Sequence, residues 1–126
     1  MNKSTLDMYV RPDNILVVFT EDTTDVTLQD WHDTIIKILN DPDGPVKHLY
    51  DFRRVDRVTL KAVREAAKMK KHPRSRFTHV AILTRDFTTI TLVKAAMSVT
   101  QQGDFAFFTD EEDAIAWLNK QAPEGE

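Results

Sequence analysis

The sequence predicts one α/β domain, in which an N-terminal hairpin is followed by β–α repeats that form a mostly parallel sheet of about five strands with four helices. Two observations predict this fold class. Short apolar runs alternate with segments whose apolar residues recur at helical spacing, and a hairpin followed by such units implies parallel strands with right-handed crossovers. The 126 residues, 41% of them hydrophobic, suffice for one packed core. We expect residues 1–122 to form the domain and residues 123–126 to be a flexible tail.

Five segments are predicted to be strands. In the first, Leu6, Met8 and Val10 alternate onto one face, and a turn at residues 11–14 connects it to the continuous apolar run 15–19. These two segments form the expected hairpin. The predicted strands are residues 4–10, 15–19, 48–52, 78–83 and 105–108.

The first helix has the clearest pattern of the chain. Its apolar stripe runs from Leu28 to Leu39, and Thr27 stands where an N-cap is expected. Breakers at residues 40–45 end it. Trp31 falls on the inward face, so we expect core packing rather than ligand stacking.

Helices are also expected after each of the last three strands. The second carries its apolar stripe from Leu60, and Asp86 is the expected cap of the third. Thr109 and Glu112 have the spacing of a capping box at the start of the fourth helix. Trp117 lies on the inward face of this last helix, and we expect it in the core as well.

Residue types that common enzyme classes require are missing. There is no cysteine, and the three glycines are isolated, so thiolate chemistry and Gly-rich phosphate or dinucleotide loops are excluded. The four histidines lack metal-ligand spacing, and the adjacent pair His32–Asp33 is expected on a solvated helix surface. We therefore predict a non-enzymatic protein with no catalytic residue, no metal and no cofactor. A hydrolase that uses His32 or His79 is the least favoured alternative.

Composition also limits location and partners. The longest apolar runs, such as residues 15–19, are far shorter than the ~20 residues that span a bilayer, and the N-terminus has no signal-peptide pattern. With no cysteine, this predicts a cytoplasmic protein without membrane insertion. A net charge of −3 argues against nucleic acid as a partner.

The charge is unevenly distributed along the chain. Residues 47–76 contain eleven Lys or Arg and three acids, a net charge of +8 that leaves −11 for the rest. A solvated face is the commonest meaning of a charge run, a surface for an acidic protein or an anionic ligand comes next, and nucleic acid is third because few aromatic residues interleave. The expected interaction surface consists of Arg53, Arg54, Arg57, Lys61, Arg64 and Lys68.

Thr59 precedes the second predicted helix and has two interpretations. Its hydroxyl can cap the helix, which is the favoured one. It can also be a modified residue, because a phosphate there would be stabilised by the helix dipole and the neighbouring arginines.

The C-terminal half resembles a known family. Residues 77–83, FTHVAIL, and residues 105–118, FAFFTDEEDAIAWL, are similar to the closing segment of SpoIIAA-like, STAS-type domains. In that segment a strand ending in Phe leads into a helix with an acidic start and an Ala-x-x-Trp-Leu finish. The resemblance implies a β–α superhelical fold and non-enzymatic work as a protein-interaction switch, as in anti-sigma-factor antagonists, while related domains bind small apolar ligands.

The switch branch of this family is phosphorylated on a serine in an Asp-Ser-Ser/Thr-Gly motif after the middle strand. Here residues 51–60, DFRRVDRVTL, occupy that place. Asp51 corresponds to the aspartate, but the serine pair and the glycine are missing, and Thr59 is an approximate match only. The chain is identified as a divergent member without the phosphorylatable motif.

These observations lead to one expected function and one alternative. The first is a regulatory or protein-interaction module that binds an acidic partner through the basic segment, or another copy of itself as a homodimer. The alternative is a carrier of the same fold for a small apolar or anionic ligand.

Overall fold

The structure confirms a five-stranded mixed sheet. In this computed structural model the described residues are 3–55, 59, 61–62, 64–65, 78–85, 91 and 104–120. The strands follow chain order across the sheet, with β1 antiparallel to β2 and every later pair of neighbours parallel. The strands are β1 (Asp7–Val10), β2 (Ile15–Phe19), β3 (Lys47–Asp51), β4 (His79–Leu83) and β5 (Asp104–Phe108).

The hairpin turn between β1 and β2 has the tight backbone that its residues predict. Asn14 has a φ of 63°, in the left-handed region that asparagine tolerates better than most residues. Its N–H donates to the Arg11 carbonyl oxygen at 2.9 Å, and the Arg11 side chain donates from Nε to Asp13 at 3.0 Å. The turn is therefore held by contacts among its own residues and from outside, because Asn119 Nδ2 donates to Asp13 Oδ2 at 3.1 Å.

Helix α1 (Asp25–Leu39) begins earlier than the sequence predicts. Thr24 is its N-cap, with a hydroxyl oxygen that accepts from the Thr27 N–H at 3.4 Å, so the prediction of Thr27 as the cap is wrong. Thr27 is instead buried within the first turn, where its hydroxyl accepts from the N–H of Thr5 at 3.1 Å. The helix ends at Asn40, its C-cap, as the breakers of residues 40–45 predict.

Helix α4 (Glu111–Lys120) is capped by Asp110 and not by Thr109. Asp110 Oδ1 accepts from the Glu112 N–H at 2.8 Å, and the Asp110 carbonyl oxygen accepts from the Ala114 N–H at 3.2 Å. The predicted capping box is therefore wrong by one residue, because Glu112 occupies the second helical position and not the third. A carboxylate at the N-cap also interacts favourably with the positive end of the helix.

Asp110→Ala is expected to lower the free energy of unfolding by about 1 kcal/mol, because the Glu112 N–H loses its acceptor. Thr109→Ala is the matched control, since Thr109 is exposed and lies outside the cap, and it should cost less than about 0.5 kcal/mol. Urea unfolding of both variants measures the difference. Equal losses, or a larger loss for Thr109→Ala, would contradict this assignment of the cap.

The second and third predicted helices lie mostly outside the described residues. The described positions 61–62, 64–65 and 91 are helical. The predicted cap Asp86 and the predicted tail 123–126 both lie outside the described residues. Two helices, α1 and α4, are described along their whole length.

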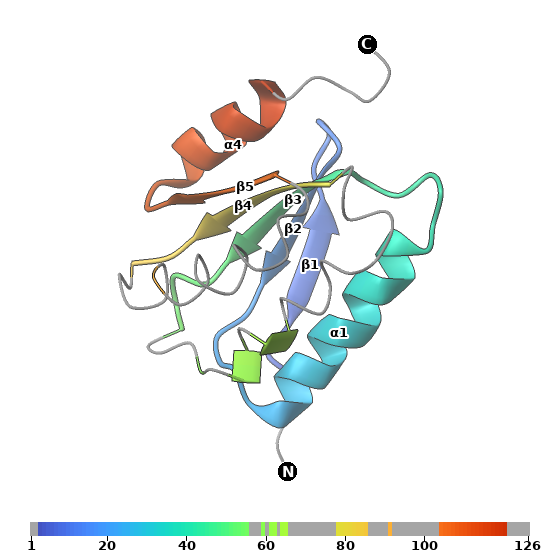
Figure 1. Cartoon of the computed structure of the whole chain (residues 1–126), viewed down its shortest axis with the longest axis vertical. Helices are drawn as coiled ribbons and strands as arrows, with labels where there is room; N and C mark the ends of the chain where they lie inside the picture. Colours follow the sequence, from blue (N-terminus) through green and yellow to red (C-terminus); the bar gives the residue numbers. More distant parts are fainter. Residues whose placement is uncertain are drawn as a thin grey trace.

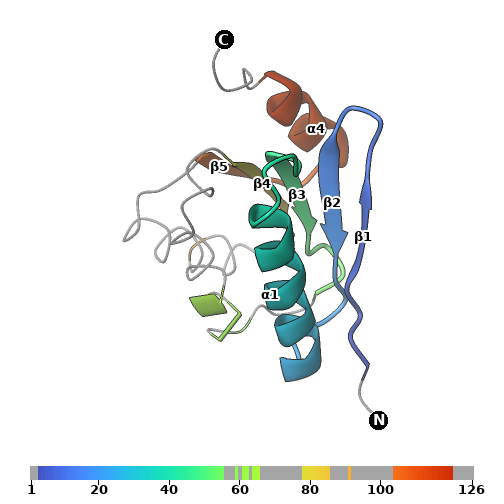
Figure 2. The same ribbon diagram turned by 90° about the vertical axis from the view of Figure 1, so that its right-hand side faces the viewer.

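These two helices cover opposite faces of the sheet, as Figures 1 and 2 show. Side chains of β2 alternate between the faces: Leu16 and Val18 pack with α1, whereas Ile15 and Val17 pack with α4. All four are at most 4% exposed, which is the pattern of a parallel strand covered on both sides. The candidate functional residues lie at the carboxyl ends of the strands.

A polar pair, His48 and Tyr50, is buried in β3. His48 Nε2 lies 3.0 Å from the Pro45 carbonyl oxygen, and Nδ1 lies 2.9 Å from the Tyr50 hydroxyl. A carbonyl can only accept, so Nε2 carries the proton and Nδ1 accepts from Tyr50. Burial raises the pKa of the Tyr50 phenol, which keeps this donor protonated. The pair thus satisfies its own polar atoms within the core.

Candidate functional site

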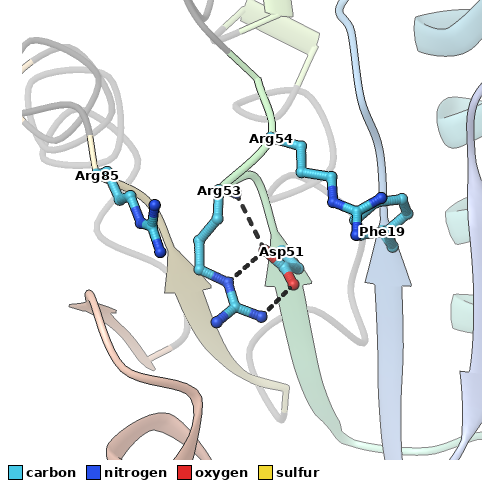
Figure 3. A pocket seen from close by; sticks show the side chains of 5 residues that line it. All are labelled: Phe19, Asp51, Arg53, Arg54 and Arg85. Atoms are coloured by element: carbon cyan, nitrogen blue, oxygen red, sulfur yellow. Dashed lines mark hydrogen bonds and ion pairs between the residues drawn. The ribbon is translucent and has the colours of Figure 1, made fainter.

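The carboxyl ends of β2, β3 and β4 meet at one edge of the sheet, where an open pocket of about 280 Å³ lies. Parallel pairing places the residues that end or follow each strand side by side, which is where α/β sheets commonly bind ligands. The lining residues, drawn in Figure 3, are Phe19 at the end of β2, Asp51 at the end of β3, Arg53 and Arg54 after it, and Arg85 after β4. We call this site the arginine pocket.

Arg53 is held firmly by Asp51. The guanidinium donates from Nε to Oδ1 at 3.0 Å and from Nη2 to Oδ2 at 2.7 Å, and the Arg53 backbone N–H also donates to Oδ1 at 3.0 Å. Arg53 Nη2 lies 3.8 Å from Glu111 Oε1 at the start of α4. The two-pronged pair fixes the guanidinium plane in a way that a single contact would not.

The Asp51 carboxyl remains ionised although it is only 6% exposed. Burial alone would raise its pKa, but the hydrogen bonds from Arg53 and the charges of Arg53 and Arg54 outweigh this and lower the pKa below its usual value. The same hydrogen bond raises the pKa of Arg53. Both members of the pair therefore keep their charges across the physiological pH range.

This pair should make stability depend on pH in acid. Because the folded-state pKa of Asp51 lies below the ordinary value of 3.8, the stabilising contribution is complete above that value and is lost as the pH falls through the lower folded-state pKa. We expect the difference in unfolding free energy between wild type and Asp51→Asn to be constant from about pH 5 to 7 and to shrink below about pH 4. Denaturant unfolding at stepped pH measures it; a difference that widens in acid would contradict the lowered pKa.

Arg54 is held more loosely, across the Phe19 ring. Its guanidinium carbon lies 5.0 Å from the ring centroid, within the range of a cation–π contact. Arg54 Nη1 also lies 3.2 Å from Glu21 Oε1, and the two side chains are 69% and 50% exposed. Exposed pairs of this kind contribute little free energy, so this contact exchanges easily.

Arg85 supplies the third guanidinium from the segment that follows β4. Figure 3 shows its side chain extending toward the Arg53 side of the pocket. Among the residues that the structure describes, none forms a hydrogen bond or an ion pair with the Arg85 guanidinium. Its N–H donors are therefore open to a ligand.

The structure brings together only part of the predicted interaction surface. Arg53 and Arg54 line the pocket, whereas Lys61 lies beside the start of α1, where its Nζ contacts Asp25 Oδ1 at 2.6 Å. Arg64 is exposed and does not line the pocket. Arg57 and Lys68 lie outside the described residues.

Two other residues that the sequence singled out have structural partners. Thr59 Oγ1 accepts from the Ala62 N–H at 3.2 Å, which is the capping interaction favoured above. His32 Nδ1 lies 3.5 Å from Glu65 Oε2, so the carboxylate that His32 approaches is that of Glu65 and not that of its neighbour Asp33. Modification of Thr59 stays a prediction.

The sequence interpretation missed Phe19, Arg85 and the part that Asp51 plays in the pocket. A usable signal was present, because each of the three lies at or just beyond the carboxyl end of a predicted strand, with Asp51 one residue before the predicted end of its own. Since parallel strands end at the same edge, these positions are neighbours even though 66 positions separate Phe19 from Arg85 in the numbering. Charge counting along the chain could not reveal this, because Arg85 is outside the basic segment.

Within the described part of the chain, no three His, Asp or Glu side chains come together as metal ligands. No helix in that same part combines the length and apolar character needed to cross a bilayer.

Comparison with known proteins places this chain in a family. The SpoIIAA-like family model matches residues 15–119, and the chain therefore belongs to the SpoIIAA-like family. No curated protein matches it by sequence.

Two solved structures are similar in fold. An uncharacterised protein of the DUF3478 family from Shewanella loihica PV-4, with a SpoIIAA-like fold, is 23% identical; the match covers 94% of this chain and 95% of that one, with a TM-score of 0.65. An anti-sigma factor antagonist from Mycobacterium paratuberculosis is 14% identical, with 90% and 94% covered and a TM-score of 0.63. The recognised family and the predicted fold class are thus confirmed.

Proposed function

We propose that this protein is a non-enzymatic interaction module that binds an acidic group of a protein partner in the arginine pocket. The single observation that carries this proposal is that three arginines, Arg53, Arg54 and Arg85, line one pocket at the carboxyl edge of the sheet. Arginine is the side chain best suited to hold a carboxylate or phosphate by paired N–H donors. The pocket is open to solvent, so a group carried on a protein surface can reach it.

The chemistry of the lining supports binding over catalysis. None of the five lining residues offers a hydroxyl, thiol, amine or imidazole nucleophile or base, and Asp51 is occupied by Arg53 and has a lowered pKa. Its carboxylate is therefore a weak proton acceptor at neutral pH. The fold similarity to an anti-sigma factor antagonist agrees with a regulatory role through protein contacts.

The proposal is tested by quantitative affinity capture from a lysate of the source organism, with partners identified by mass spectrometry. The double variant Arg54→Gln/Arg85→Gln should lose the partner that wild type captures in stoichiometric amount, with at least about ten-fold weaker binding. Lys37→Gln/Lys120→Gln removes the same charge from exposed positions outside the pocket and should retain it. Equal capture by wild type and the pocket variant would refute the proposal.

Another copy of this chain is also a suitable partner, since the acidic remainder of the sequence complements the basic segment. Sedimentation at low salt distinguishes this case. A dimer that dissociates in the pocket variant identifies self-association, whereas a monomer at all concentrations excludes it.

A small-molecule carrier is the second function that an observation favours. The pocket volume of about 280 Å³ is near the lower end of the range for small-ligand sites, and Phe19 adds an apolar surface beside the guanidiniums. Native mass spectrometry of freshly purified protein tests it. An adduct present in wild type and missing from Arg54→Gln/Arg85→Gln supports a carrier, and an intact mass without adduct contradicts it.

A further inference from the structure

Strand β1 forms one edge of the sheet, and its side chains are apolar although they are exposed. Among the described residues β1 pairs with β2 alone, and Figure 2 shows it along the outer rim of the sheet. Four large hydrophobic side chains are exposed in the described part of the chain, and three of them, Met8, Tyr9 and Val10, belong to β1, at 41%, 55% and 53%. An exposed apolar edge strand is a template for pairing with another strand.

The direction of each backbone group in β1 follows from the hairpin turn. The Arg11 N–H donates to the Ile15 carbonyl oxygen, and the Arg11 carbonyl oxygen accepts from the Asn14 N–H, both at 2.9 Å. Both backbone groups of Arg11 therefore point toward β2. Because this direction alternates along an antiparallel strand, Tyr9 and Asp7 also direct theirs toward β2.

Met8 and Val10, in contrast, direct their backbone groups toward the open edge. Within the segments that the structure describes, no residue pairs with the Val10 N–H or with either carbonyl oxygen. The Met8 N–H donates to Oδ1 of the adjacent Asp7 at 2.9 Å, which is a contact between chain neighbours and not with a strand. The edge can therefore form hydrogen bonds with another strand.

The residues around β1 select one register for pairing with a second copy. Two antiparallel copies can join outward groups to outward groups about a two-fold axis at Met8, Tyr9 or Val10. An axis at Val10 would set Met8 opposite Pro12, which has no N–H. An axis at Met8 would set Val10 opposite Leu6, whose N–H already donates to a serine hydroxyl of its own chain at 3.1 Å. The axis at Tyr9 pairs Met8 of each copy with Val10 of the other.

The axis at Tyr9 also brings opposite charges together. It sets Asp7 of each copy across from Arg11 of the other, in positions where facing side chains approach closely. The contacts of Arg11 with Asp13 use Nε and Nη2, so Nη1 can accept a second carboxylate as its partner. Asp7 then exchanges the Met8 N–H for a guanidinium. This complementarity under two-fold symmetry favours a second copy of the chain over an unrelated strand.

We propose that two copies of this chain associate through β1, antiparallel and about a two-fold axis at Tyr9, so that their sheets join into one. The side chains of Met8 and Val10 pack against each other across the axis and are removed from water. A strand of four residues buries little surface, so the dimer is weak and depends on concentration. The inference is separate from the proposed function, because no residue of β1 lines the arginine pocket.

Sedimentation velocity over a series of concentrations, up to about 1 mM, tests the association. Wild type should form a dimer whose fraction rises with concentration. The pocket variant Arg54→Gln/Arg85→Gln should dimerise as wild type does, because its substitutions lie outside β1. A monomer at every concentration, or a dimer that the pocket variant loses, overturns the proposal and leaves the capture experiment to decide the proposed function.

A charge exchange tests the register. Asp7→Arg and Arg11→Asp each place like charges across the axis, so each variant alone should dimerise at least about ten-fold more weakly. An equimolar mixture restores opposite charges on both sides of the axis and should dimerise about as well as wild type, which also shows that both variants are folded. Asp43→Arg makes the same charge change at an exposed position outside β1 and should have no effect. Undiminished association of either single variant, or no recovery in the mixture, overturns this pairing.

Discussion

Trp31→Ala is expected to lower the free energy of unfolding by about 3–5 kcal/mol, the largest effect of any substitution considered for this chain. Trp31 is 5% exposed and packs edge-on against Tyr50, with ring centroids 5.7 Å apart and an interplanar angle of 82°. Removing the indole leaves a cavity between α1 and β3 that the neighbouring side chains fill only partly. Urea unfolding followed by circular dichroism measures the loss.

Trp117→Ala is the matched control for this prediction. Trp117 was also expected in the core, but it is only partly buried, at the surface of the α4 layer, where its ring lies 5.9 Å from that of Phe108. It should cost clearly less than Trp31→Ala, about 2 kcal/mol, because part of the indole is already in water. A larger loss for Trp117→Ala would contradict the burial of the two residues.

Arg53→Gln is expected to have the second largest effect, a loss of about 2–3 kcal/mol. Asp51 would keep its backbone donor but lose both contacts from the guanidinium, at 3.0 and 2.7 Å, while 6% exposed. A buried carboxylate without its partner is costly, because desolvation is no longer offset. The partial exposure of Arg53, 29% for its side chain, keeps the effect below that of a fully buried pair.

The double variant Arg53→Gln/Asp51→Asn completes the cycle. It should recover part of the stability that Arg53→Gln loses, because a neutral amide costs less to bury than a carboxylate. Denaturation curves of the two single variants and the double variant give the coupling energy. Additive losses in the double variant would show that the pair does not contribute as described.

The fold could be predicted because each element is signalled locally. β2 was predicted at its observed bounds, since five consecutive apolar residues between a turn and a polar segment leave little choice. The two caps could not be predicted, for different reasons. At α1, the Thr27 hydroxyl is in contact with Thr5, 22 residues away, which the local sequence does not signal. At α4, two adjacent residues, Thr109 and Asp110, both have capping side chains.

Only part of the candidate site could be predicted from the sequence, because the rest depends on which strands are neighbours in the sheet. Arg53 and Arg54 belong to a basic segment that charge counting finds. Arg85 and Phe19 join them through the parallel register of β2, β3 and β4, which becomes known only when the strand order is known. Lys61 was grouped with the arginines because it belongs to the same basic segment. In the structure, however, Lys61 is helical and its partner is Asp25 in α1.

The most direct test of binding at the arginine pocket is to map backbone amide shifts by NMR when the captured partner is added. The largest shifts are expected at the carboxyl edge, at Phe19, residues 51–54 and Arg85, and the same titration of Arg54→Gln/Arg85→Gln should show none. Shifts confined to the exposed edge strand Asp7–Val10 or to the outer face of α1, with the pocket unchanged, would contradict binding at this site.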